Sequence, residues 1–144
     1  VGTITEPAHF KAASDVGAQF GVSPGFTHTL AKASRDASFP WLPGIMTPGE
    51  LMQAREAGFQ CCKLFPAQQA GGVRMLKSLH AVLPEMLFCP TGGIELDNAR
   101  DFLALPNVAC VGGSWVAPRS LVESCNWLGI RKLAQEAAAL PRLA

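Results

Sequence analysis

Six short apolar runs recur along this chain at nearly constant intervals, and this spacing constrains the fold more than any other feature of the sequence. Successive runs end 20, 21, 21, 26 and 23 residues apart. Each interval has room for about one βα unit, so the repeated alternation of strand and helix predicts a parallel β-sheet. The runs end near Thr3, Ser23, Gly44, Phe65, Thr91 and Ser114.

The stretches between the runs carry signals of helices. Residues 47–50, Thr-Pro-Gly-Glu, combine a hydroxyl N-cap, proline at the first helical position and glutamate three residues after the cap, and Gly58 can end that helix. An apolar stripe over residues 73–83 predicts a second helix that stops at Pro84. Phe102, Leu103 and Leu105 repeat this pattern before Pro106, and residues 131–140 predict a closing helix.

Two architectures use parallel βα units, an open doubly wound sheet and a closed (β/α)8 TIM barrel. The uniform spacing, without a G-x-G-x-x-G opening after the first run, favours the barrel. A barrel needs eight units and only six are visible, so we expect about two βα units to precede Val1 in the native polypeptide. The sequence therefore predicts that residues 1–144 form a single barrel domain that is incomplete at its N-terminus.

Composition limits the partners of the chain. It has 144 residues, of which 49% are hydrophobic and 16% charged, which is typical of one globular domain. The net charge is +1 and the basic residues are scattered, so the sequence predicts binding to neither nucleic acid nor a membrane. The five cysteines lie mostly in strand-like runs, and the histidines are dispersed, which argues against disulfides and metal sites. We expect a cytoplasmic protein.

Lys63 interrupts the apolar run Gln60-Cys61-Cys62-Lys63-Leu64-Phe65-Pro66. In a buried strand its ammonium would lose hydration, and its pKa would fall from the usual value of about 10.4. A lysine that is neutral near pH 7 can attack a carbonyl carbon and form a Schiff base. Two structural alternatives remain open: the side chain reaches solvent from a strand end, or it pairs with a carboxylate.

Glycine pairs follow the last two predicted strands, at Gly92-Gly93 and Gly112-Gly113, and Ser114 adds a hydroxyl. The carboxyl ends of parallel strands meet at one edge of a sheet, where exposed backbone N–H groups can bind phosphate. Taken singly, each pair is more typical of a tight turn. Phe65 could cover one wall of a pocket there, although phenylalanine in a strand is usually a core residue.

Taken in order, several segments resemble the 2-keto-3-deoxy-6-phosphogluconate (KDPG) aldolase / 4-hydroxy-2-oxoglutarate aldolase family. The most specific are Lys63-Leu64-Phe65-Pro66-Ala67 and Cys89-Pro90-Thr91-Gly92-Gly93-Ile94. The resemblance extends over nearly the whole chain and also includes Gly2-Thr3, Ser23-Pro24-Gly25, Pro43-Gly44-Ile45, Gly71-Gly72-Val73 and Gly112-Gly113-Ser114-Trp115.

The resemblance implies a class I aldolase of the Entner–Doudoroff pathway in which Lys63 is catalytic. Lys63 would form a Schiff base with the C2 ketone of the phosphorylated keto acid, and cleavage would release pyruvate and glyceraldehyde 3-phosphate without a metal or other cofactor. Family members are commonly trimers, and Trp41, Trp115 or Trp127 could serve such an interface. The resemblance also implies that Thr3, Pro24, Phe65 and Thr91 contact the keto acid, and that Gly92, Gly93, Gly113 and Ser114 hold the phosphate.

The family's proton-shuttling glutamate and carboxylate-binding arginine are expected upstream of the position that matches Val1. Glu95 and Asp97 follow a strand end, but they are better interpreted as signals for the start of the next helix. Three alternatives therefore remain open. They are cleavage of 4-hydroxy-2-oxoglutarate, cleavage of the galactonate epimer of the substrate, and a non-catalytic phosphate-binding barrel in which Lys63 is only a cationic contact.

Overall fold

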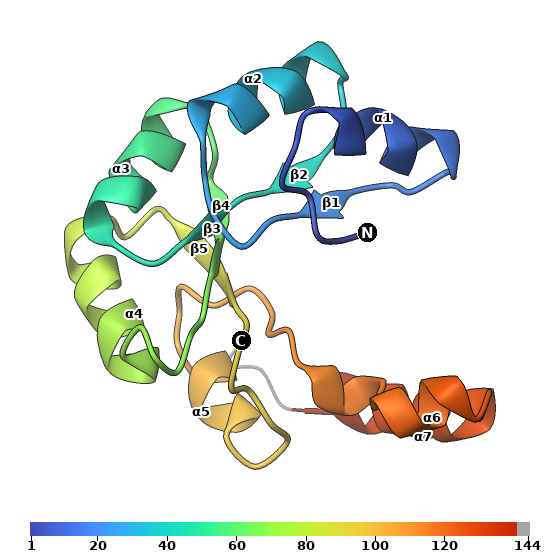
Figure 1. Cartoon of the computed structure of the whole chain (residues 1–144). Helices are drawn as coiled ribbons and strands as arrows, with labels where there is room; N and C mark the ends of the chain where they lie inside the picture. Colours follow the sequence, from blue (N-terminus) through green and yellow to red (C-terminus); the bar gives the residue numbers. More distant parts are fainter. Residues whose placement is uncertain (141–144) are drawn as a thin grey trace.

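Short parallel strands form the centre of the structure, a computed structural model that describes residues 1–140 (Figure 1). β1 pairs with β2, and β3, β4 and β5 form a second sheet in that order. All of these pairings are parallel, which confirms the predicted parallel α/β fold class. The strands are β1 (Gly21–Val22), β2 (Trp41–Leu42), β3 (Gly44–Ile45), β4 (Cys61–Leu64) and β5 (Leu87–Pro90).

Isolated bridges extend this row of strands on both sides. Gly2 bridges to Val22, beside β1, while Phe88 bridges to Val108 and Thr91 to Gly112, beside β5. The segment at 108–114, expected to be a strand, thus pairs only at these two points and then enters a 3-10 helix at Ser114. The third predicted run is divided at Pro43 into β2 and β3, because proline has no N–H to donate to a ladder.

Helices follow the strands, as the sequence predicted, and α1 to α5 form an arc outside them (Figure 1). The closing helix begins at Trp127, four residues before its expected start, because Asn126 caps it by accepting a hydrogen bond from the Gly129 N–H. The helices are α1 (Ala8–Asp15), α2 (His28–Asp36), α3 (Pro48–Glu56), α4 (Gly72–Val82), α5 (Ala99–Leu103), η1 (Ser114–Val116, 3-10), α6 (Arg119–Glu123) and α7 (Trp127–Ala138).

The predicted start of α3 is confirmed in detail. The Glu50 N–H donates to Thr47 Oγ1 over 3.3 Å, and the Thr47 N–H donates to Glu50 Oε2 over 2.8 Å, which completes a capping box. Gly58, with φ of +90°, follows the end of the helix. This geometry fixes where the chain leaves β3, the neighbour of the strand that carries Lys63.

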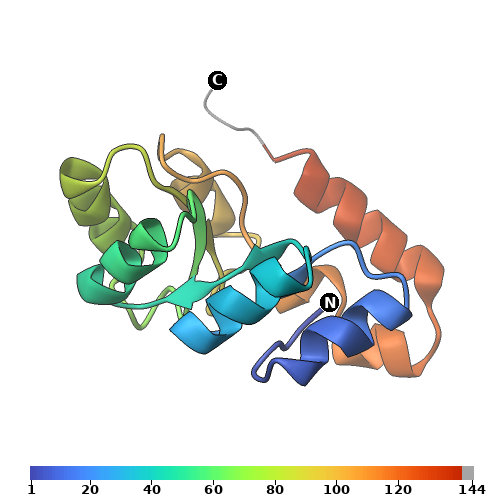
Figure 2. The ribbon, with the colours of Figure 1, turned by 90° about the horizontal axis from the view of Figure 1, so that it is seen from above.

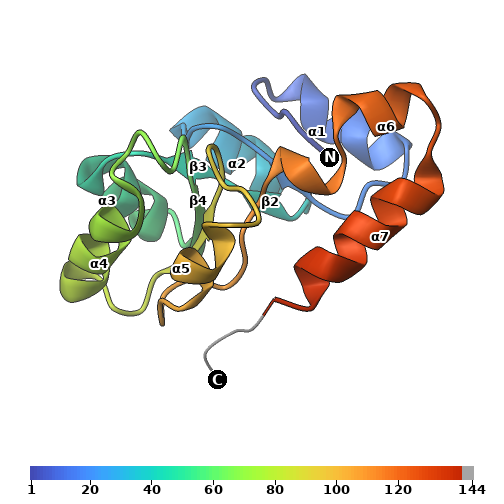
Figure 3. The same cartoon turned by 90° about the horizontal axis from the view of Figure 1, so that it is seen from below.

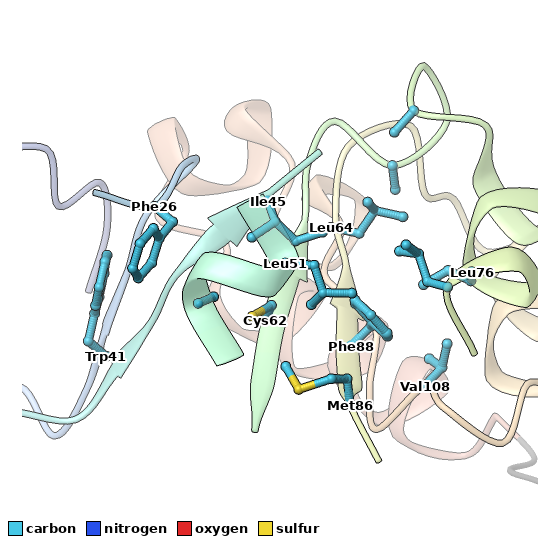
Figure 4. Close-up of a cluster of buried hydrophobic side chains, with 14 of the residues drawn as sticks. Phe26, Trp41, Ile45, Leu51, Cys62, Leu64, Leu76, Met86, Phe88 and Val108 are labelled. Atoms are coloured by element: carbon cyan, nitrogen blue, oxygen red, sulfur yellow. The ribbon is translucent and has the colours of Figure 1, made fainter. Parts of the chain in front are cut away.

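One face of the strands packs against the helices and the other does not. In β4 and β5 the buried residues are Cys62, Leu64, Phe88 and Pro90, which alternate with half-buried or exposed ones. Figure 4 shows the buried side, where Leu51 of α3 and Leu76 of α4 lie against this sheet. Each fully buried Leu or Phe contributes about 1.5–3 kcal/mol, so the helical arc holds the strands in place.

The C-terminal helices lie apart from the arc. Figures 2 and 3 show α3 and α4 at one side of the molecule and α7 at the other. Trp127 on α7 is 61% exposed, whereas Trp41 is 8% exposed and stacks in an aromatic cluster, so Trp41 is a core residue and the prediction that it could serve an interface is wrong. Among residues 1–140 no helix is both long and apolar enough to cross a membrane.

Candidate active site

Lys63 is the third residue of β4 and lies on the face of the sheet that the helices leave uncovered. It is half-buried, between the buried residues Cys62 and Leu64, and its strand neighbours in register are Gly44 on β3 and Cys89 on β5. Its backbone N–H donates to the Pro43 carbonyl over 2.7 Å. The lysine is therefore held in mid-sheet at a fixed register, between Gly44 and Cys89.

The electrostatic surroundings disfavour an ammonium at Lys63. Burial lowers the pKa of this amine, and Cys89 acts in the opposite direction. The pKa of the Cys89 thiol is itself raised, first by a hydrogen bond with Cys110 and then by burial, so Cys89 is uncharged near neutral pH. None of the four ion pairs found within residues 1–140 includes Lys63, which contradicts the carboxylate-pair alternative.

The ring of Phe65 lies beside this amine. Lys63 Nζ is 4.2 Å from the ring centroid, and Phe65 is half-buried on the same face, two residues further along the chain. The interpretation of Phe65 as a core residue is therefore wrong. The ring excludes water from one side of the amine, and its negative face attracts a cation with about 0.5–1 kcal/mol.

Pro24 lies against Gly44 of β3, the strand next to the one that carries Lys63. A Cβ placed on Gly44 would come within 2.2–2.6 Å of the Pro24 carbonyl group and the Gly25 nitrogen, so only glycine allows this close approach. Because Gly44 is the register partner of Lys63, the Pro24–Gly25 peptide borders the same region. Thr3 is exposed and lies further off, beyond β1 and β2–β3 in the row of strands.

The two predicted glycine turns are adjacent. Thr91 bridges to Gly112, and a Cβ on Gly113 would lie 2.8 Å from the Ile94 carbonyl oxygen. Gly92 and Gly93 both have positive φ, +97° and +74°, in the left-handed region that glycine adopts without strain. The structure thus brings the turns after β5 and after the 108–112 segment together at one edge.

Several backbone donors in these turns are unused. The N–H groups of Gly92, Gly93, Gly113 and Ser114 have no acceptor within residues 1–140, whereas the Gly112 N–H donates to the Pro90 carbonyl. Ser114 is exposed at the start of η1. Unpaired N–H groups at neighbouring glycine turns are typical of sites that bind an oxyanion.

Some site residues were missed or misinterpreted at the level of sequence. Ser23 is 1% exposed, and its hydroxyl bonds to Ile4 and Trp41, so it faces the helices. Glu95 and Asp97 directly precede α5, which begins at Ala99, so their interpretation as signals for the start of a helix is consistent with the structure. Asn98 binds back to the glycine turn, and no motif in the sequence signals that contact.

In the described part of the chain, no group of three His, Cys, Asp or Glu side chains could hold a metal ion. Cys61, Cys89 and Cys110 do lie along the uncovered face, but burial raises the pKa of Cys61 and the Cys110 contact raises that of Cys89. Thiols with raised pKa are weak metal ligands and weak nucleophiles. The chemistry of this face therefore centres on the amine of Lys63.

Known proteins match this chain over most of its length. The family model for KDPG and KHG aldolases matches residues 1–133. A 2-dehydro-3-deoxy-phosphogluconate aldolase of Pseudomonas aeruginosa is 43% identical over 136 residues, which are 94% of this chain and 62% of the relative. The chain therefore spans less than two thirds of the length of this relative.

Two solved structures are similar. A KDPG aldolase from Legionella pneumophila, with pyruvate captured as a covalent carbinolamine, superposes with a TM-score of 0.90 at 41% identity over 94% of this chain and 66% of that one. The 2-keto-3-deoxy-6-phosphogluconate aldolase of Zymomonas mobilis with 3-phosphoglycerate gives a TM-score of 0.89 at 36% identity, over 99% and 66%. The arrangement of strands around Lys63 is thus one that is found in aldolases.

Proposed function

Because the chain belongs to the KDPG and KHG aldolase family, we propose that it contributes the Schiff-base half of a class I aldolase that cleaves KDPG to pyruvate and glyceraldehyde 3-phosphate. The observation that carries this proposal is the half-buried Lys63 amine, which has a lowered pKa and the face of Phe65 beside it. The covalent carbinolamine described for the Legionella relative supports the same chemistry.

In this mechanism the neutral Nζ of Lys63 attacks C2 of the keto acid and forms a carbinolamine, which loses water to give a protonated imine. The C4 hydroxyl then gives its proton to water, its oxygen forms the aldehyde C=O, and the electrons of the C3–C4 bond move to the imine, so that glyceraldehyde 3-phosphate leaves and an enamine remains. Protonation at C3 and hydrolysis release pyruvate and restore Lys63. The Phe65 ring, 4.2 Å from Nζ, stabilises the positive charge of the imine.

The remaining site residues have binding roles in this proposal. Pro24 and Phe65 shape the pocket around the pyruvate part, Thr91 bonds to the keto acid, and Thr3 contacts its carboxylate. The support for Thr3 is weaker, since it lies beyond β1 in the row of strands. The phosphate is held by Gly92, Gly93, Gly113 and Ser114, whose N–H groups have no acceptor within residues 1–140.

Further proposals concern the whole protein. We propose that the parallel strands are part of a single (β/α)8 barrel whose interior is the face that carries Lys63, and that the protein is a cytoplasmic trimer. The alternation of buried and half-buried residues in β4 and β5 supports the barrel, because inward and outward positions alternate along barrel strands. The exposed Trp127 and Leu128 of α7 are candidates for a subunit contact.

A second substrate is 4-hydroxy-2-oxoglutarate, since the matching family includes KHG aldolases. It contains the same 2-keto-acid group as KDPG but no phosphate, so it would react at Lys63 without using the glycine turns. Release of pyruvate from each compound tests the proposal, and we expect KDPG to be the preferred substrate.

Lys63→Met should release no pyruvate from either compound. The control Lys32→Met changes an exposed lysine paired with Asp36 and should keep the activity. Equal turnover by Lys63→Met would refute a Schiff base.

A further inference from the structure

Asn98 occupies the position before α5, where an asparagine normally caps the helix with its own side chain. Here it makes no such capping bond. Its Nδ2 donates to the Gly93 carbonyl over 3.0 Å, and its Oδ1 accepts from the Glu95 N–H over 3.0 Å. The side chain is therefore directed backward, and it ties the glycine turn after β5 to the start of the helix.

This bond selects one orientation of a peptide group that could otherwise rotate. Gly92 and Gly93 both have positive φ and lack side chains, so the turn has little intrinsic preference for the direction of its carbonyl groups. In a trans peptide the C=O and the following N–H point in opposite directions. By holding the Gly93 carbonyl, Asn98 turns the N–H of Ile94 to the opposite side of the peptide. The partial negative charge of the carbonyl oxygen is thereby kept away from the side that the N–H faces.

The segment held in this way touches the second glycine turn. Ile94 is 2% exposed, which anchors its side chain in the core, and its carbonyl oxygen lies 2.8 Å from the place that a Cβ on Gly113 would occupy. The position of the 94–95 peptide therefore sets the spacing between the two turns. Asn98 holds this peptide through the Glu95 N–H and the preceding one through the Gly93 carbonyl.

We propose that Asn98 is a positioning residue of the phosphate site: by bonding to the Gly93 carbonyl and the Glu95 N–H it keeps the turn after β5 against the turn at Gly113, so that the N–H groups of both turns converge on a phosphate ester. This inference rests on the proposed phosphate role of these turns. It assigns Asn98 no contact with substrate. It predicts that loss of the side chain weakens recognition of phosphate while Schiff-base formation at Lys63 continues.

The test compares two ligands that need different parts of the site. Binding of 3-phosphoglycerate, measured by calorimetry, reports on the turns, and borohydride trapping of pyruvate reports on Lys63. In Asn98→Ala we expect about tenfold weaker binding of 3-phosphoglycerate, the effect of a lost hydrogen bond that orders the site, with pyruvate trapped at the wild-type rate. The matched control is Asn126→Ala, which removes one cap bond at the start of α7 and should change neither.

A second variant protects the test against misfolding. Asn98→Ser provides a hydroxyl that favours the start of a helix but is too short to reach Gly93, so we expect the same weakening of binding. Unchanged binding of 3-phosphoglycerate in both variants, or loss of trapping together with binding, would overturn the inference. If the wild-type chain binds no 3-phosphoglycerate, the inference also fails. If it binds 3-phosphoglycerate but traps no pyruvate, only the Schiff-base proposal fails.

Discussion

Lys63 combines two influences that act in opposite directions on its proton. Burial lowers the pKa of the amine, whereas the face of the Phe65 ring attracts the cation. The pKa of Lys63 is lowered from its usual value. A reactive amine and a stabilised iminium need both effects, because the amine must attack as a neutral base and then carry a positive charge.

The pH dependence of adduct formation tests the residue directly. The neutral fraction of an amine rises with pH and levels off above its pKa, so trapping of pyruvate should level off below 10.5, the pKa of an ordinary lysine. The unfolded chain binds this proton more tightly. Unfolding free energy should therefore rise with pH between the lowered pKa and 10.5, and Lys63→Met should remove that rise. A plateau reached only above pH 10.5 would contradict the assignment.

The ring of Phe65 should stabilise the positive charge of the imine at Lys63. Phe65→Leu keeps an apolar side chain but removes the ring face, which contributes about 0.5–1 kcal/mol to a nearby cation. We expect the pyruvate concentration for half-maximal trapping to rise about two- to fivefold. Phe20→Leu, a change at an exposed phenylalanine, is the control. An unchanged concentration would show that the ring does not stabilise the imine.

At the scale of elements, the turns after the strands depend on the absence of side chains. A Cβ on Gly113 would lie 1.6 Å from the Trp115 ring, so Gly113→Ala forces the turn and η1 apart. We expect a loss of about 1–3 kcal/mol in unfolding free energy, together with loss of 3-phosphoglycerate binding. Gly49→Ala in α3 has no atom within 4 Å of the added methyl group and should preserve both. Equal stability of the two variants would refute this packing.

The helix that follows β3 gives an independent check. Thr47→Ala removes the acceptor for the Glu50 N–H, and we expect about 1 kcal/mol less stability in chemical denaturation. The hydrogen bonds from Met46 and Thr47 outweigh burial and lower the pKa of Glu50. This part of the stability is present above the usual carboxyl pKa and is lost as the pH falls through the lowered one. A capping contribution that does not change at acid pH would contradict the box.

Local signals in the sequence predicted these elements well. Thr47, Pro48 and Glu50 define a helix start by short-range hydrogen bonds, and the positions of Lys63 and the glycine pairs follow from the strand period. The contact of Phe65 with Lys63 depends on which face of β4 the helices leave uncovered. The bond from Asn98 to Gly93 depends on the path of a turn. The alternation of strand residues places residues 63 and 65 on one face, so the sequence could suggest that Phe65 lines the pocket but not its contact with the amine. The bond from Asn98 has no periodic signature, so the sequence could not reveal it.

At the scale of the whole molecule, proton transfer is the step that the described residues support least. No carboxylate within residues 1–140 forms an ion pair with Lys63 or shifts its pKa. General acid–base catalysis typically contributes about 10²- to 10⁴-fold in rate. We therefore expect this chain to release pyruvate from KDPG that much more slowly than the Pseudomonas relative, in a coupled assay, while it still forms the adduct. Equal rates would show that a group in this chain performs the acid–base catalysis, which would contradict the expectation.

Condensation of the Lys63 amine with a 2-keto acid can be tested by reduction of the adduct. The chain is incubated with pyruvate and borohydride, digested, and mapped by mass spectrometry. We expect a reduced pyruvate adduct on Lys63 alone, absent from Lys63→Met and retained in Lys32→Met. An unmodified Lys63, or an adduct spread over the exposed lysines, would contradict it.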